Sequence, residues 1–449
     1  MEIGKSRTNI EPFKSIIIVW CSLIFVYIII DFFRVFFDNS KYLLVFNDLF
    51  IFFLGSYIVF KRRNWYYFVE HVPINILISL FFFVILIFFQ LFNLNVINFS
   101  TNIAGLRTYL LPILGIIVGY EFGVSNTLNN ARVYKFVLLV LLLVVGFSVF
   151  QILIDTSKLG DIALSLVTSR EHAFHSHEDQ SISLTSSFFA SGKKLGRFLT
   201  FLYLVYLGLR FNLKKQYNIL VFITFLVGLI SSGSREAVYA FFFINVISFL
   251  KFSNIRSIIN LLFYSFFSFL FFLFFEINSD SITRLNFLVA FDEDFGERLI
   301  GLFPFSLIKF DNDSVFFGMG LGKYGQEAIL VQSISDLGEK YLSIFFDSNY
   351  SNVISDSGIV KVVIETGIIG FFFFGLLICG ITYFALSILI KVLYNSDRII
   401  FNMCLYIILW FFFFLKAHSI LSDIFLTFNF FFAFGYIAAF KRKSILKYD

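Results

Sequence analysis

The sequence predicts an all-α integral membrane protein with about twelve transmembrane helices, in a single polytopic domain over residues 1–449. Hydrophobic residues make up 59% of the chain and charged residues only 14%, which leaves too little polar surface to cover a soluble core. Pro occurs only 4 times, so long helices can satisfy their own backbone hydrogen bonds in lipid. Apolar runs of bilayer length, about 20 residues, recur along the whole chain.

Each apolar run that can cross the hydrocarbon core is followed by a polar segment that can lie at the membrane surface. We expect spans at 15–33, 43–60, 74–92, 104–122, 134–154, 195–211, 217–232, 237–250, 257–276, 357–390, 399–415 and 420–440. The eighth span is short for a bilayer, and the tenth is long enough to begin outside it.

The positions of Lys and Arg orient these helices. If the N-terminus lies in the cytoplasm, every second connection is cytoplasmic and carries cations, whereas the short connections between them carry almost none. The cytoplasmic cations are then Lys61, Arg62 and Arg63; Arg132 and Lys135; Arg210, Lys214 and Lys215; Lys251 and Arg256; Lys391 and Arg398; and Lys441, Arg442, Lys443 and Lys447. This alternation predicts that both termini are cytoplasmic. The net charge of +5 is therefore a topology signal, and we expect no nucleic-acid partner.

Two connections on the opposite side are long. They cover 155–194 and 277–355, and loops longer than about 15 residues are usually functional or disordered. We expect 277–355, between the ninth and tenth helices, to form a large extracytoplasmic loop region. His172, His175 and His177 in the first connection could bind a metal, but the plain loop interpretation is favoured, and we predict no metal site.

Four arginines fall on the side of these long connections: Arg107, Arg197, Arg235 and Arg298. A charged side chain at the centre of a spanning helix costs about 2.5–3.5 kcal/mol, so it usually faces a cavity or a partner. Guanidinium groups bind phosphate oxygens through two parallel hydrogen bonds. Together these residues could hold a diphosphate. The alternatives are an ion pair or snorkelling for Arg107 and Arg235, and a solvated charge for Arg298.

Two further features belong to the same side. Gly318, Gly320 and Gly322 alternate along the chain, and glycine permits positive φ and close backbone approach to a ligand; an ordinary loop is the alternative. Asp356 stands near the start of the tenth predicted helix. It could cap that helix, or it could accept the proton of a sugar hydroxyl.

Four local patterns between about residues 185 and 375 are similar, in the same order, to those of a known family. They are Thr185-Ser186-Ser187-Phe188-Phe189 with Leu195-Gly196-Arg197, Ser232-Gly233-Ser234-Arg235-Glu236, Gly318-Met319-Gly320-Leu321-Gly322, and Asp356-Ser357 through Glu365-Thr366-Gly367-Ile368-Ile369-Gly370. In these patterns the chain resembles the O-antigen polymerase and O-antigen ligase family. The ligase pattern has His where this chain has Asp356, which favours the polymerase.

The resemblance implies a GT-C-like fold and a glycosyltransferase of the bacterial inner membrane. Such an enzyme transfers a growing glycan from undecaprenyl diphosphate onto a new lipid-linked repeat unit at the periplasmic face, with inversion and without metal or other cofactor. Its partners would be undecaprenyl-diphosphate-linked oligosaccharide repeat units, membrane lipid and a chain-length regulator protein.

The roles that follow are catalysis by Asp356 and Arg235, diphosphate binding by Arg107, Arg197, Arg235 and Arg298, and a substrate loop at Gly318, Gly320 and Gly322. The alternative functions are an O-antigen ligase and a flippase for lipid-linked oligosaccharide. Flippases usually lack a long outward loop and show two related halves, and neither property fits this sequence.

Overall fold

The structure is a computed structural model. It describes residues 20–30, 41–61, 67–92, 99–125, 131–156, 189, 192–209, 215–232, 234–252, 314–322, 358–393, 397–414, 421 and 423–445. All regular elements within these ranges are helices, and none is a strand. The all-α prediction is therefore confirmed for this part of the chain.

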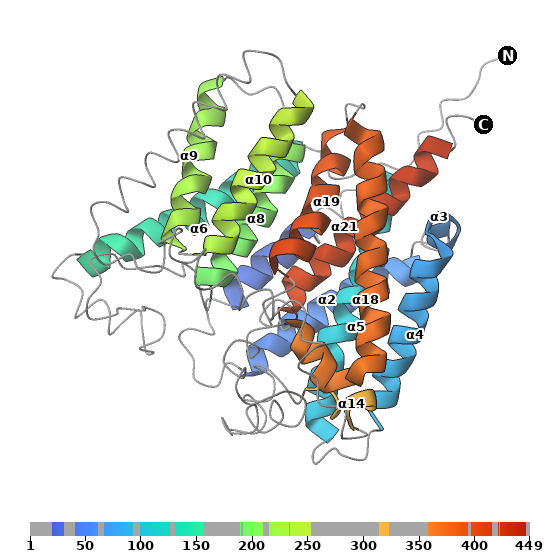
Figure 1. Ribbon diagram of the computed structural model, residues 1–449. Coiled ribbons are helices and arrows are strands. Elements are labelled where there is room, and N and C mark those ends of the chain that lie inside the picture. The colour runs from blue at the N-terminus through green and yellow to red at the C-terminus, as the bar shows by residue number, and fades with distance from the viewer. Residues whose placement is uncertain are drawn as a thin grey trace, which may run out of the picture.

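A helical segment at 20–30 precedes the labelled helices of Figure 1. These are α2 (Lys41–Lys61), α3 (Phe68–His71), α4 (Ile74–Gln90), α5 (Phe99–Ser125), α6 (Ala131–Thr156), α8 (Gly192–Gly208), α9 (Lys215–Ser231), α10 (Arg235–Phe252), α14 (Ser314–Phe317), α18 (Gly358–Leu393), α19 (Arg398–Leu409), η4 (Trp410–Phe414) and α21 (Ile424–Ile445). Each predicted span falls on one of these helical segments, except 257–276, which lies outside the described residues. The short helix α3 was not predicted.

Three helical segments are long and apolar enough to cross a membrane, namely Gly105–Ser125, Arg132–Phe150 and Gly358–Val392. The apolar stretches of the other helices in the described ranges are shorter, at 10–17 residues. The structure thus supports a membrane protein through these three helices. The larger number of spans stays a prediction, and so does the loop region at 277–355, of which only 314–322 is described.

Large apolar side chains cover part of the outer surface. Phe53 and Phe60 on α2, Phe81 and Phe89 on α4, and Leu142 on α6 are each more than half exposed. In water, an apolar surface of this extent would promote association with other surfaces. Lipid tails solvate such side chains without cost, so this surface fits a membrane environment.

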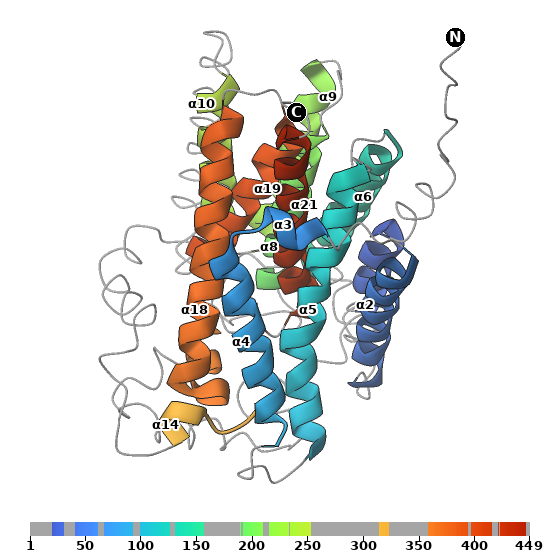
Figure 2. The same cartoon turned by 90° about the vertical axis from the view of Figure 1, so that its right-hand side faces the viewer.

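The helices form two groups that α19 joins. In Figure 1, α6, α8, α9 and α10 stand together on the left, and α4, α5, α18 and α21 stand on the right. Helix α19 contacts α8 of the first group and both α18 and α21 of the second. Figure 2 shows α14 at the lower ends of α4 and α18.

Among the described helices, the most extensive contact joins α5 to α21. Three glycines spaced four residues apart line this contact on α5, at Gly115, Gly119 and Gly123. A Cβ at Gly119 would meet the backbone of Phe432, and a Cβ at Gly435 on α21 would meet the backbone of Ile116. Small residues at this spacing let two helix backbones pack against each other within a membrane. The backbones of α5 and α21 can approach this closely because these glycines have no side chain at the contact, which we call the α5–α21 seam.

Helix ends that the cation pattern assigns to the same side meet each other. The first part of α5 reaches the segment at Gly322 through Gly105, whereas at the opposite end Gly208 of α8 lies against Ile399 of α19. Cations at this second end, such as Arg132 and Lys391, are exposed. These two contacts agree with the sides that the cation pattern gives to the helix ends involved, while the side of the membrane that each end faces stays a prediction.

Candidate functional site

Buried charged side chains gather at the end of the bundle where α5, α8, α10, α18 and α21 begin, which we call the charged end. They are Asp48, Lys194, Arg197, Lys361, Glu365 and Asp423, each at most 9% exposed. Of the buried charged residues in the described ranges, only Glu121 on α5 lies away from this end. Because a buried charge without a partner is very costly, the pairing of these groups decides what the site can do.

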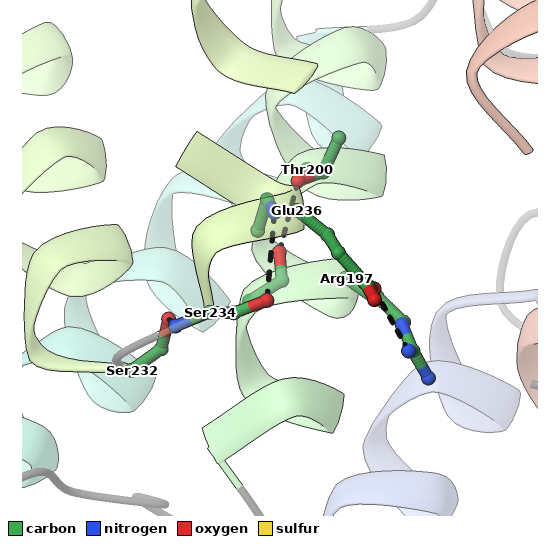
Figure 3. Close-up of polar contacts among 7 residues, drawn as sticks. Arg197, Thr200, Ser232, Ser234 and Glu236 are labelled. Atoms are coloured by element: carbon green, nitrogen blue, oxygen red, sulfur yellow. Dashed lines mark hydrogen bonds and ion pairs between the residues drawn. The ribbon is translucent and has the colours of Figure 1, made fainter. Parts of the chain in front are cut away.

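Arg197 on α8 is paired with Glu236 in the first turn of α10. The Arg197 side chain is fully buried, and its Nη2 lies 2.9 Å from Glu236 Oε2. The pair depends on Gly196, where an added Cβ would stand 2.6 Å from the Cβ of Ser234. Glycine at this position lets the start of α10 pack directly on α8 (Figure 3).

The turn before α10 positions Glu236. Ser232 Oγ accepts a hydrogen bond from Ser234 N at 3.2 Å, and Ser234 Oγ accepts one from Ala237 N at 3.4 Å. Serine at such a position satisfies a backbone N–H of the first helical turn. Two of the sequence patterns, Leu195-Gly196-Arg197 and Ser232 to Glu236, therefore form one local unit.

A second buried group joins three helical segments around Asp423, which precedes α21. The Tyr27 hydroxyl donates to Asp423 Oδ2 at 2.6 Å, and Lys194 Nζ lies 3.4 Å from the same oxygen. Asp423 Oδ1 accepts from Leu426 N at 3.2 Å, so Asp423 also caps α21. The carboxylate thus ties the segment at 20–30, α8 and α21 together.

Arg107 on α5 is held by a carboxylate as well. Its Nη1 lies 2.6 Å from Asp48 Oδ2 on α2, and both side chains are mostly buried. The structure therefore brings Arg107 and Arg197 to the charged end, each with a carboxylate partner. The backbone of Arg235 begins α10 beside Glu236, but its side chain, Arg298 and Asp356 lie outside the described residues.

The three alternating glycines adopt the left-handed conformation that only glycine adopts readily. The φ angles of Gly318, Gly320 and Gly322 are 79°, 99° and 70°. Their segment packs on a break in α18 at Gly367, where φ is 70°, and Met319 N donates to Ile364 O at 2.8 Å. Gly318 makes a close backbone approach to Glu365 and Gly367, and Gly322 makes one to Gly105, so both approaches are to the protein itself.

Glu365 is buried directly beside this break. Its Oε2 accepts a hydrogen bond from the Tyr109 hydroxyl at 2.7 Å, and its carboxylate is fully buried. Lys361 is also fully buried and lies one helical turn earlier on α18. The Gly318–Gly322 pattern, the Glu365–Gly367 pattern and the start of α5 thus meet in one place.

The sequence interpretation missed the carboxylates Asp48 and Asp423, the cation Lys194 and the phenols Tyr27 and Tyr109. Two of them carried a signal. Lys194 stands three residues before Arg197, so both fall on one helix face, and Asp423 stands where an N-cap is expected before the apolar run of α21. Tyr27 and Tyr109 carried no such signal, because a Tyr within an apolar run is most often a residue of the hydrophobic core.

Replacing Tyr109 by Phe should destabilise the protein by about 1–3 kcal/mol, because the buried Glu365 carboxylate loses a donor and keeps its desolvation cost. The measurement is the thermal unfolding midpoint of the purified protein in detergent. Tyr383→Phe on the exposed face of α18 is the matched control and should leave the midpoint unchanged. Equal midpoints for the two variants would show that the Tyr109 hydrogen bond contributes nothing.

The described residues contain no group of three or more His, Cys, Asp or Glu side chains that could hold a metal. His172, His175 and His177 lie outside them.

Comparison of the sequence with models of protein families finds no match. A search of curated proteins finds no match either. Over the described residues, fold and site define the class: a helical protein with three apolar helices of membrane-spanning length, and with buried charges gathered at one end.

Proposed function

We propose that this protein is a surface-polysaccharide polymerase, a glycosyltransferase that uses undecaprenyl-diphosphate-linked repeat units in the bacterial inner membrane. The observation that carries the proposal is the burial of Arg197, with Lys194 one turn away, in a bundle whose interior is mostly apolar. A buried guanidinium in such surroundings usually serves a substrate or a partner. A lipid diphosphate is an anion that reaches the protein through the membrane, which fits this placement.

The reaction needs cations more than it needs an acid. The hydroxyl oxygen of the acceptor sugar bonds to the anomeric carbon of the growing glycan, and the bond from that carbon to the diphosphate oxygen breaks. The electron pair leaves with the diphosphate, where positive side chains stabilise the developing charge. The hydroxyl proton passes to a carboxylate, for which Asp356 is the candidate. Direct displacement of this kind inverts the anomeric carbon.

The charged end would face the periplasm in this proposal. The exposed cations Arg132, Lys135, Lys391 and Arg398 would then lie in the cytoplasm, as the positive-inside rule requires. Lipid-linked repeat units would reach the charged end from the outer leaflet. Chain length would be set by a separate regulator protein.

Deletion of the gene, followed by gel analysis of surface glycans, tests the proposal. A polymerase deletion should collapse the ladder of chain lengths to a single repeat unit attached to its lipid carrier or core. Loss of every glycan from the lipid A core would instead indicate a ligase. Accumulation of lipid-linked repeat units on the cytoplasmic side would indicate a flippase.

A further inference from the structure

Lys194 and Arg197 are neighbours on one face of α8. They stand three positions apart in the sequence, which places their Cβ atoms about 5–6 Å apart. Both side chains are more than nine-tenths buried, and each reaches a carboxylate on a different helix, Asp423 and Glu236 respectively. Two cations at this distance are within reach of the same diphosphate group.

The two carboxylates do not depend on these cations alone. Asp423 accepts its shortest hydrogen bond, at 2.6 Å, from Tyr27 and another from Leu426 N, whereas Lys194 Nζ is the most distant of its partners at 3.4 Å. Glu236 lies in the first turn of α10, where the helix dipole stabilises negative charge. Each carboxylate would therefore keep favourable contacts if its cation turned to another anion.

We propose that Lys194 and Arg197 form a diphosphate clamp that Asp423 and Glu236 keep occupied until substrate binds. The ligand's oxygens then replace the carboxylate oxygens as partners of the two cations. Arg197 supplies the planar fork and Lys194 the mobile point charge. The inference deepens the proposed function and rests on it, because it assigns Lys194 to substrate binding and gives the carboxylates the role of competitors.

A purely structural salt bridge makes a different prediction from a competing one. Asn at position 423 can keep its Oδ1 on Leu426 N and so still cap α21, and its Nδ2 then donates to the Tyr27 oxygen in place of accepting from it. The substitution removes the negative charge that competes for Lys194. If Asp423 competes with substrate, Asp423→Asn should bind diphosphate more tightly. If the pair is only structural, Lys194→Gln is harmful because it leaves the Asp423 charge buried, and combining both changes should restore the protein.

The test is the dissociation constant of the purified protein in lipid nanodiscs for undecaprenyl diphosphate and for inorganic pyrophosphate, at fixed ionic strength. Lys194→Gln should bind the lipid diphosphate about tenfold more weakly, and Asp423→Asn should bind it more tightly. The double variant should stay about as weak as Lys194→Gln. Lys135→Gln, an exposed cation at the opposite end, is the matched control and should bind as wild type.

Wild-type affinity in the double variant would overturn the inference, because it would show that Lys194 acts only on Asp423. Equal affinity of all variants would overturn it as well while leaving the polymerase proposal standing. A wild-type protein that binds no lipid diphosphate would overturn both the clamp and the proposed polymerase function. If the variants change the dissociation constant for inorganic pyrophosphate in the same order, the clamp recognises the diphosphate alone. If only the dissociation constant for the lipid changes, binding also needs the membrane-embedded chain.

Discussion

Replacing Gly119 by Leu should remove most of the folded protein. Gly119 lies in the α5–α21 seam, where an added Cβ would stand 2.7 Å from the carbonyl carbon of Phe432 and 2.9 Å from its Cα. Backbone cannot swing aside as a side chain can, so the two helices would have to separate. Overpacking of a close contact costs about 1–3 kcal/mol, and a complete Leu side chain at this crossing should cost at least the upper figure, roughly 3 kcal/mol.

The measurement is the yield of monodisperse protein after extraction, followed by thermal unfolding monitored through tryptophan fluorescence. Trp20 stacks on Phe432 with ring centroids 6.4 Å apart, so its emission reports on the seam. Gly146→Leu on α6 is the matched control, because a Cβ there meets nothing within 4 Å. That variant should unfold within about 0.5 kcal/mol of wild type. Similar yields and midpoints for the two variants would mean that the seam tolerates separation.

The positions of the helices could be predicted because an apolar run of bilayer length has few alternatives in lipid. The same pattern does not say which helices are neighbours. The spacing of Gly115, Gly119 and Gly123 was not among the signals used in the sequence analysis, and the structure shows that it serves the contact with α21. The break in α18 at Gly367 was also hidden, because the Gly318 segment packs against it from a distant part of the chain.

Of the charged side chains that the structure places at the charged end, the sequence analysis singled out Arg107 and Arg197 and missed Lys194, Asp48 and Asp423. Arg107 and Arg197 were found because an arginine within an apolar run needs a reason to be there. Their partners, Asp48 and Glu236, become partners only when α2 lies beside α5 and α10 beside α8. A single sequence does not contain that arrangement. For the same reason the sequence left open whether each arginine is paired or available to substrate.

Arg197→Lys should reduce polymerisation at least about tenfold while the protein stays folded. Lysine keeps the positive charge, so Glu236 still has a buried partner and the free energy of unfolding should change little. What lysine loses is the planar fork that makes two parallel bonds to phosphate oxygens. A hydrogen bond to a charged group contributes about 1.5–3 kcal/mol, and each 1.4 kcal/mol corresponds to a factor of about ten.

The matched control for this prediction is Arg132→Lys, the same exchange at an exposed position of the opposite end. Glycan ladders are compared at equal protein abundance, and thermal midpoints are measured on the purified variants. A shortened ladder with an unchanged midpoint in Arg197→Lys, and a normal ladder in Arg132→Lys, is the expected pair of results. A normal ladder in both would leave the Arg197–Glu236 pair as a helix-joining contact, since charge alone would then be enough at position 197. A lowered midpoint together with a shortened ladder in Arg197→Lys would contradict the expectation that lysine keeps the protein folded, and would assign Arg197 a part in stability.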